Sequence, residues 1–210
     1  TQADQLAVHF KSNSGEVVSL AEAVGVSEGE VVDGAVMSKA ALVQFLEASI
    51  KAAKDQGVLW SLHLKATMMK VSDPIMFGHA VKAYYRDVFE QYGAVFEALS
   101  VDPNNGIGDA YEKIEQLSSE QRSEIKAALD AYLTEGTAQA MVDSDRGITN
   151  LHVPSDIIID ASMPAAIRES GQMWAPNGEL HDMMAVIPDR CYAGVYAETI
   201  KDCQANGAFD

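Results

Sequence analysis

Cysteine is scarce in this sequence. The 210 residues contain 2 cysteines, Cys191 and Cys203. Their spacing fits neither a zinc-binding motif nor a disulfide framework. If a helix joins them, they lie about 18 Å apart along its axis and cannot bond to each other. We therefore expect a reducing, cytoplasmic setting.

Long apolar runs and basic residues are scarce as well. The sequence has no run of about 18 apolar residues, so it offers no membrane-spanning helix, and its first residues lack the pattern of a secretory signal. Lys and Arg number 15 against 31 Asp and Glu, a formal net charge of −16. This charge repels phosphates, which argues against nucleic acid and anionic membranes as partners. It is compatible with a divalent cation. The chain starts at Thr1 without an initiator Met, which indicates processing, trimming or an excised piece.

Several catalytic motifs are absent. The sequence has no GxSxG elbow, no GxxxxGK phosphate loop and no HExxH. Gly106-Ile107-Gly108 begins like a dinucleotide-binding motif, but Tyr111 stands where the third glycine belongs. The segment 143–147 weakly resembles a calcium loop and lacks the later bidentate Glu. Neither segment is predicted to be a site.

What the sequence does contain is the composition and pattern of a packed α/β protein. Hydrophobic residues make up 48%, and strand-like segments alternate with helix-like ones. Strands are predicted at 17–20, 31–37, 58–64, 138–143 and 183–187. Helices are predicted after the N-caps Ser38, Asp73 and Ser118 and over 164–169 and 192–205. The Asp73 helix carries apolar residues as far as Tyr92. We expect a mixed open sheet flanked by helices, in a single unit over residues 1–210 with a candidate peripheral helical excursion at 105–136.

One set of polar residues lies at the end of a predicted strand. Alternation along 58–64 places Ser61, His63 and Lys65 on one face, with Lys65 at the C-terminal end. Open α/β sheets bind ligands just beyond such ends, where a Lys can meet a substrate oxygen and transfer a proton. The alternative is a surface strand with a solvated polar face, and the pattern by itself favours that alternative. His63 alone is better explained as a hydrogen-bonded structural residue than as a ligand.

A second set is the pair of carboxylates in Asp156-Ile157-Ile158-Ile159-Asp160. Four residues apart, Asp156 and Asp160 share a face in a strand or a helix. Carboxylates beside an Ile run are costly to bury unless they are paired or bind a cation, and hard oxygen ligands suit Mg²⁺ or Mn²⁺. The alternative is that each Asp only caps a helix, and the pattern alone slightly favours that interpretation.

Two long strings identify a family that the chain resembles. They are LHLKATMMKVSDP at 62–74 and MVDSDRGITNLHVPSD at 141–156. Both resemble the monomeric, NADP-dependent isocitrate dehydrogenases of bacteria, and IDASMP at 159–164 and SGQMW at 170–174 continue the similarity. The resemblance covers essentially the whole chain and is weakest at 14–27 and 109–137. Members of this family are several times longer, so the chain resembles an internal piece of the large domain of a multi-domain enzyme.

The resemblance implies an activity and assigns two site residues. Family members oxidise isocitrate with NADP and release CO₂, giving 2-oxoglutarate, in the tricarboxylic acid cycle and the glyoxylate bypass. This reaction needs Mg²⁺ or Mn²⁺ at the substrate oxygens and residues that move protons. By resemblance, Lys65 is the catalytic lysine and Asp160 is the metal ligand.

The rest of the family's site matches nothing in this sequence. The other metal ligands, the catalytic Tyr, the groups that hold isocitrate and most of the NADP site belong to the remainder of the parent polypeptide. The chain by itself is therefore expected to be inactive. An alternative from another class is a non-catalytic folding or assembly module that self-associates as a homo-oligomer.

Overall fold

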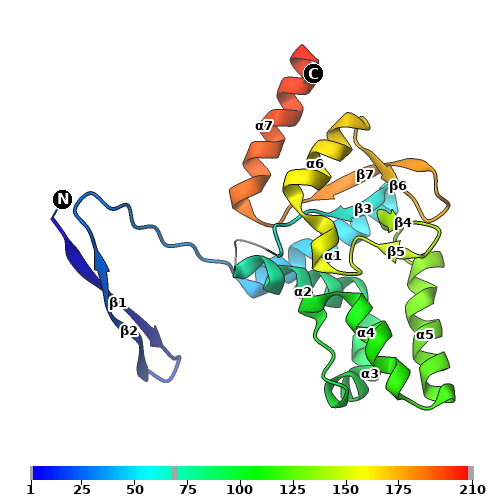
Figure 1. Ribbon diagram of the computed structural model, residues 1–210, viewed down its shortest axis with the longest axis horizontal. Helices are drawn as coiled ribbons and strands as arrows, with labels where there is room; N and C mark the ends of the chain where they lie inside the picture. The colour runs from blue at the N-terminus through cyan, green and yellow to red at the C-terminus, as the bar shows by residue number, and fades with distance from the viewer. Residues whose placement is uncertain (1, 68–70, 208–210) are drawn as a thin grey trace. The chain divides into compact units, whose positions relative to one another are not determined.

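The computed structural model describes residues 2–67 and 71–207. Contacts divide the chain into two compact units, Thr1–Met37 and Ser38–Asp210. Figure 1 draws both units. The sequence pattern predicted a single unit over residues 1–210. That the two units belong to one domain of a larger enzyme stays a prediction.

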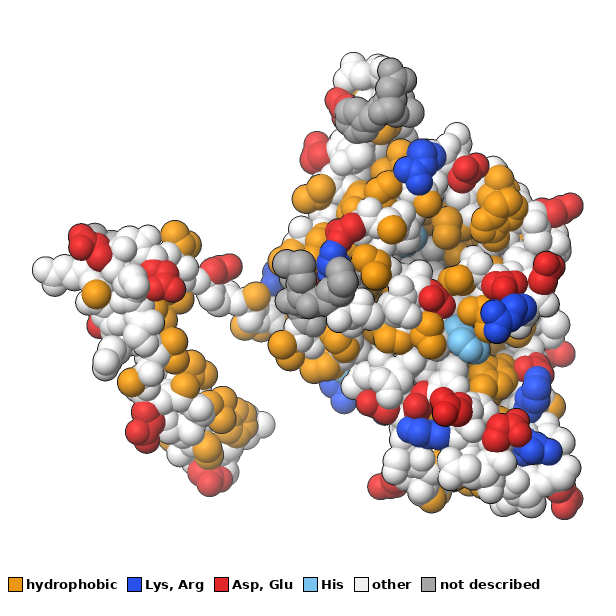
Figure 2. Space-filling model, viewed as in Figure 1, with side chains coloured by type: hydrophobic (Ala, Val, Ile, Leu, Met, Phe, Trp, Pro, Cys, Tyr) orange, Lys and Arg blue, Asp and Glu red, His pale blue; other side chains and the backbone are white. Residues whose placement is uncertain are grey.

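The first unit is a β-hairpin. Strands β1 (Asp4–Lys11) and β2 (Val17–Val26) pair antiparallel, with Leu6 opposite Val24 and Phe10 opposite Val18. Its large apolar side chains remain exposed, among them Leu6, Val8, Phe10, Val17, Val18, Leu20 and Val24. Figure 2 shows such hydrophobic side chains along the hairpin. Because a two-stranded hairpin is at best marginally stable in water, these side chains are a candidate surface for association.

Of the two strands predicted in this unit, one is confirmed and one is wrong. The strand predicted at 17–20 exists within β2, but its partner β1 was missed, although Leu6, Val8 and Phe10 alternate as strand residues do. The strand predicted at 31–37 is wrong. No strand forms there, and Val31 stays 91% exposed. Its Val-rich composition misled the prediction because strand propensity expresses packing against neighbours rather than a backbone preference.

The second unit is built on a small mixed sheet. Strands β3 (Leu59–Leu62), β7 (Leu180–Val186) and β6 (Gln172–Trp174) lie in the order β3-β7-β6, with β3 parallel to β7 and β6 antiparallel to it. Beyond the end of β3, Leu64 forms an isolated parallel bridge with Ile158. Strands β4 (Met141–Asp143) and β5 (Ile148–Thr149) form a separate pair. The predicted α/β class, a mixed open sheet flanked by helices, is confirmed.

Several helices begin and end where local sequence predicts. Helix α1 (Lys39–Gln56) starts after Ser38, whose Oγ accepts the Ala41 N–H at 3.3 Å, and ends at Gly57 with φ 67°. Glycine adopts this left-handed conformation without steric cost. Helix α5 (Ser119–Thr134) has Ser118 as its predicted cap. Helix α7 (Arg190–Asn206) carries both cysteines, which are free.

The helix predicted after Asp73 differs from the one observed. It is divided at Tyr85 into α2 (Ser72–Tyr84) and α3 (Arg86–Ala98). The predicted N-cap is wrong because α2 starts at Ser72 and the Asp73 side chain is fully buried. Tyr85, at φ −96° and ψ 32°, is itself buried against Tyr84 and Tyr132. Aromatic packing thus accompanies the break in the helical pattern.

The remaining helices complete one core around the sheet. They are α4 (Ile107–Lys113), α6 (Ile159–Arg168) and the short 3₁₀ turns Pro103–Asn105, Ile114–Gln116 and Pro154–Ile157. The segment 105–136 is helical, and several of its apolar side chains belong to the same buried cluster as Trp60. In Figure 1, α6 and α7 lie on one side of the β3–β7–β6 sheet and α2 to α5 on the other.

The Gly106-Ile107-Gly108 motif is explained by packing. Ile107 N–H and Gly108 N–H donate to the carbonyls of Leu151 and His152, each at 2.9 Å. A Cβ at Gly106 would lie 2.1 Å from the His152 carbonyl oxygen. Glycine is therefore required at this position by the close approach of two backbones.

The acidic composition is visible on the surface of the protein. Figure 2 shows acidic side chains spread over the visible face of the 38–210 unit rather than gathered in one place. Among the helices of the described ranges 2–67 and 71–207, none is both long and apolar enough to cross a membrane.

Candidate functional site

Lys65 lies just beyond the C-terminal end of β3, where the sequence placed it. Its side chain is buried, with 8% of the residue exposed. Its backbone N–H donates to Asp73 Oδ2 at 2.9 Å, which ties the residue to the start of α2. A buried ammonium needs a charged or polar partner because its desolvation is costly. The partner of Lys65 therefore defines the site.

That partner is Asp160. Asp160 lies in the first turn of α6, and Lys65 Nζ forms an ion pair with Asp160 Oδ2. The Asp160 side chain is 50% exposed, whereas that of Lys65 is 10% exposed. In this pair the lysine is buried, and the carboxylate faces solvent. The two residues that sequence analysis selected from distant segments are in direct contact.

A backbone bridge brings the two segments together. Leu64 N–H donates to the Ile157 carbonyl at 3.3 Å, and Ile159 N–H donates back to the Leu64 carbonyl at 2.9 Å. The Ile159 carbonyl also accepts the Tyr196 hydroxyl of α7 at 3.2 Å. Strand end and helix start are therefore held side by side at the residues that precede Lys65 and Asp160.

A buried chain of polar side chains lies beside this bridge. His63 Nε2 is 2.9 Å from Ser61 Oγ, and His63 Nδ1 is 2.8 Å from Ser162 Oγ of α6. Asn150 Nδ2 donates to Ser61 Oγ and to the Leu62 carbonyl, both at 3.3 Å. Burial lowers the pKa of His63 to about 4, so the imidazole is neutral near pH 7. His63 is a hydrogen-bonded residue of the interior, as predicted.

The interpretation of 58–64 as a surface strand is wrong. Ser61 is fully buried and His63 is 1% exposed. In the sheet, β3 pairs with β7 on one edge and is bridged to Gln139 on the other. A strand inside a sheet with helices on both faces is buried throughout. The alternation of polar residues marks a buried polar network here and not a solvated face.

Asp73 is a second carboxyl beside Lys65. Burial raises the pKa of Asp73, the hydrogen bond from the Lys65 N–H opposes this rise, and the nearby Asp189 adds to it. Asp189 also caps α7 by accepting the Cys191 N–H at 2.8 Å. Asp73 therefore links the peptide of Lys65 to the starts of two helices.

Asp156 is the other carboxylate of the predicted pair. It belongs to the 3₁₀ turn Pro154–Ile157, and burial raises its pKa while His152 lowers it. Neither Asp156 nor Asp160 caps a helix, since Ile158 occupies the N-cap of α6. The helix-capping interpretation is wrong for both residues because the Ile158 backbone is used in the bridge to Leu64.

The fit to a divalent metal is partial. Asp160 offers a half-exposed carboxylate, a hard oxygen ligand of the kind that Mg²⁺ and Mn²⁺ prefer. Within residues 2–67 and 71–207, His, Cys, Asp and Glu form no group of three or more that could hold a metal ion. Asp160 thus fits one position in a metal site whose other ligands would come from outside these ranges.

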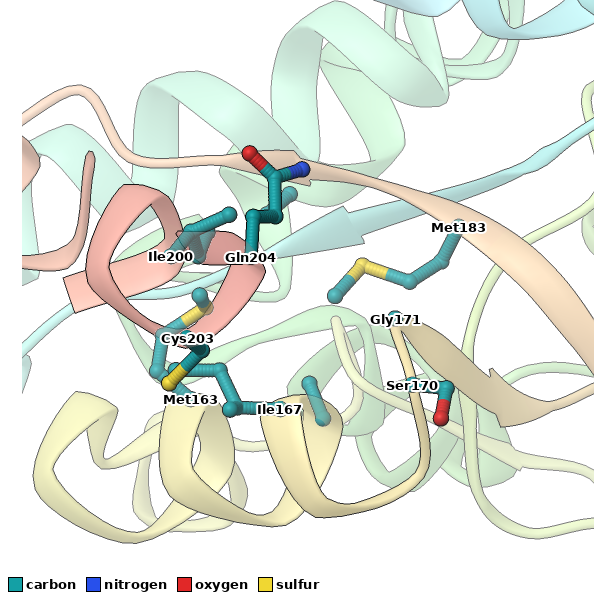
Figure 3. A pocket seen from close by; sticks show the side chains of 10 residues that line it. Met163, Ile167, Ser170, Gly171, Met183, Ile200, Cys203 and Gln204 are labelled. Carbon is teal, nitrogen blue, oxygen red and sulfur yellow. The ribbon is translucent and has the colours of Figure 1, made fainter. Parts of the chain in front are cut away.

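The site is separate from a large apolar cavity. This cavity, of about 590 Å³, lies between α6, β7 and α7 (Figure 3). Met163, Ile167 and Met183 line it together with Cys203. Neither Lys65 nor Asp160 lines it.

Sequence reasoning missed three residues around the pair. Asp73 was assigned a capping role, and Ser162 and Asn150 were not singled out. Ser162 lies within the family-like string 159–164, yet nothing in its local pattern connects it to His63. Lys70, which the sequence places five positions after Lys65, lies outside the described residues.

Fold and site together define an α/β protein with a charged pair beyond the end of a sheet strand, the usual position of ligand sites in open α/β sheets. The whole chain, residues 1–210, matches the family described as monomeric isocitrate dehydrogenase. The chain belongs to the monomeric isocitrate dehydrogenase family.

Individual relatives agree with this assignment. Over 203 residues, 97% of the chain, it is 55% identical to isocitrate dehydrogenase [NADP] 2 of Colwellia maris and 54% identical to isocitrate dehydrogenase [NADP] of Azotobacter vinelandii. It is 45% identical over 209 residues to isocitrate dehydrogenase [NADP] 2 of Mycobacterium tuberculosis. The matches cover 27%, 27% and 28% of these relatives, so the chain spans about a quarter of their length.

Proposed function

We propose that residues 1–210 are part of a longer NADP-dependent isocitrate dehydrogenase, which oxidises isocitrate and releases CO₂ to give 2-oxoglutarate. The observation that carries the proposal is the ion pair between buried Lys65 and half-exposed Asp160 at the end of β3. Family membership supports the reaction class, because the relatives are named as NADP isocitrate dehydrogenases.

Within this reaction, the two residues have different roles. When bound, NADP would supply the hydride acceptor, and Mg²⁺ or Mn²⁺ would supply positive charge at the substrate oxygens. Lys65 Nζ handles the proton of the 2-hydroxyl, for which a positioned amine is suited. Asp160 would hold the metal through one carboxylate, and its ion pair with Lys65 Nζ holds the ammonium in place. Free cysteines on α7 fit a cytoplasmic setting for this enzyme.

The experiment is substitution of both residues in the longer enzyme. Lys65→Met should reduce kcat by about two or more orders of magnitude, since it removes the proton carrier. Asp160→Asn should instead raise the Mn²⁺ concentration needed for half-maximal turnover, because a neutral amide is a weaker ligand. Wild-type turnover retained by Lys65→Met would contradict the assignment.

The isolated chain provides a second test. Transition-state stabilisation is shared among groups that act together, and this chain supplies only part of them. The pure 210-residue chain should therefore show no isocitrate-dependent NADP reduction with Mn²⁺ present. Turnover by the chain alone would show that the site is not the partial one proposed.

A second candidate function is self-association of this chain as a non-catalytic assembly module. It is favoured by the exposed apolar side chains of β1 and β2, such as Phe10 at 54% and Leu20 at 65%. Exposed apolar surface of this kind is a typical site of association. Light scattering at millimolar chain concentration should give a dimer or larger species, and a monomer would count against this function.

A further inference from the structure

His63 connects the two segments that carry the charged pair. Its Nδ1 lies 2.8 Å from Ser162 Oγ, two residues after Asp160 on α6. His63 itself lies two residues before Lys65. The hydrogen bond from His63 to Ser162 and the ion pair from Lys65 to Asp160 therefore join the same strand end to the same helix start.

The backbone alone provides a limited connection between these segments. Leu64 and Ile158 form an isolated bridge with two hydrogen bonds, and no ladder continues beyond it within the described residues. A single bridge restrains the helix start less than a continuous ladder of backbone hydrogen bonds would. A side-chain link beside the bridge adds to that restraint, and His63, at 1% exposure, is too buried to exchange this link for water.

We propose that His63 is a positioning residue, which holds the Lys65 ammonium against the Asp160 carboxylate through its hydrogen bond to Ser162. The inference deepens the proposed function and rests on it only in calling this pair the reacting site. Loss of alignment by about 1 Å can cost a hundredfold in rate. Precise alignment is therefore a reasonable use for a buried histidine that touches no reacting atom.

The hydrogen-bond pattern indicates which group donates at each step from Asn150 through Ser61 and His63 to Ser162. Asn150 Nδ2 donates to Ser61 Oγ, so the Ser61 hydroxyl proton remains to be donated, and His63 Nε2 is its neighbour. The Asn150 amide, the Ser61 hydroxyl and the His63 ring then each donate to a partner if His63 Nδ1–H donates to Ser162 Oγ. A neutral imidazole fits this order because it has one donor and one acceptor nitrogen, and burial keeps the His63 pKa low.

Two substitutions at His63 separate the two contacts. In His63→Asn the side-chain amide occupies the place of Nδ1 and can still reach Ser162. In His63→Gln it occupies the place of Nε2 and reaches Ser61 instead. Asn is therefore the conservative replacement for the proposed role, and Gln removes the link to α6. Ser162→Ala removes the same link from the other side.

Reactivity of Lys65 reports the alignment directly in the 210-residue chain. Each variant is treated briefly with acetic anhydride, and acetylation of Lys65 is measured by mass spectrometry relative to Lys51, whose side chain is 76% exposed. We expect Lys65 to react about tenfold faster in His63→Gln and in Ser162→Ala than in the wild-type chain, because local opening governs access to buried groups. His63→Asn should stay within about twofold of wild type.

A control variant distinguishes positioning from general stability. Leu129→Ala opens a cavity in the fully buried core position of α5, a helix that contributes nothing to the site. It should lower the unfolding temperature without accelerating acetylation of Lys65. If Lys65 labelling instead follows the loss of stability across all variants, including Leu129→Ala, or if His63→Gln labels as slowly as wild type, the proposal is overturned.

Kinetics in the longer enzyme give the second readout. His63→Gln should lower kcat by about tenfold with KM for isocitrate nearly unchanged, and His63→Asn should restore most of kcat. An unchanged kcat in His63→Gln would overturn the positioning role. A wild-type longer enzyme without isocitrate turnover would refute the proposed function, whereas the acetylation pattern would still decide whether His63 aligns the pair.

Discussion

Buried His63 should make the stability of the 38–210 unit depend on pH in a defined direction. Its pKa is lowered by burial from 6.5 to about 4 in the folded chain. The neutral form is therefore favoured by folding, and the stability that it provides is present above pH 6.5 and is lost as pH falls towards about 4. In the unfolded chain the same imidazole gains its proton near pH 6.5.

The size of this effect follows from the pKa difference. Each pKa unit corresponds to about 1.4 kcal/mol, so the shift of His63 sets a limit of about 3 kcal/mol. Between pH 7 and pH 5 the expected loss is about 2 kcal/mol. His63→Asn has no titrating ring and should not show this component. Other acidic and histidine groups titrate in both proteins, so they cancel in the comparison.

Urea unfolding followed by tryptophan fluorescence measures this difference. Trp60 is fully buried in the 38–210 unit and donates from Nε1 to Ser49 Oγ at 2.8 Å, so its emission reports on that unit. At pH 7 the wild-type chain should be the more stable, and at pH 5 its advantage over His63→Asn should shrink by about 2 kcal/mol. Parallel stability curves for the two proteins from pH 7 to pH 5 would refute the reasoning.

Three further predictions test other parts of the structure. The pKa of Asp73 is raised, so the stability that its protonated form provides at low pH is lost as pH rises through the folded-state pKa. Asp73→Asn should therefore gain stability relative to wild type between pH 4 and pH 7 in urea titrations. A constant stability difference between the two proteins would contradict this. Ser118→Ala removes the cap of α5 and should lower the free energy of unfolding by about 1 kcal/mol in the same assay. The control Ser119→Ala, one residue later, keeps the cap and should lower it clearly less. In the longer enzyme, Lys70→Met should reduce kcat much less than Lys65→Met, since losing a charge outside the pair is not losing the proton carrier, and equal losses would refute that distinction.

The fold class could be predicted from sequence because its signals are short in range. Ser38 and Ser118 cap helices by contacts within three residues, and Gly57 ends α1 through its own φ angle. Alternation along 58–64 identified β3 in the same way. Where prediction failed, the presence or absence of a distant contact decided the outcome. Val31 has strand propensity but no strand around it, and Asp73 is used by the Lys65 peptide rather than as a cap.

The candidate site, too, could be predicted from sequence only in part. Local position and family resemblance were enough to select Lys65 at a strand end and Asp160 beside an Ile run. Their contact is a tertiary fact, since it requires Leu64 and Ile158, far apart in the chain, to pair as neighbours. The same bridge buries His63 against Ser162 and turns a face that appeared solvated into an internal polar network. Sequence determined which groups carry charge and where the capped helices α1 and α5 begin. Only the folded chain decided which groups meet, because burial and pairing depend on segments that no local pattern connects.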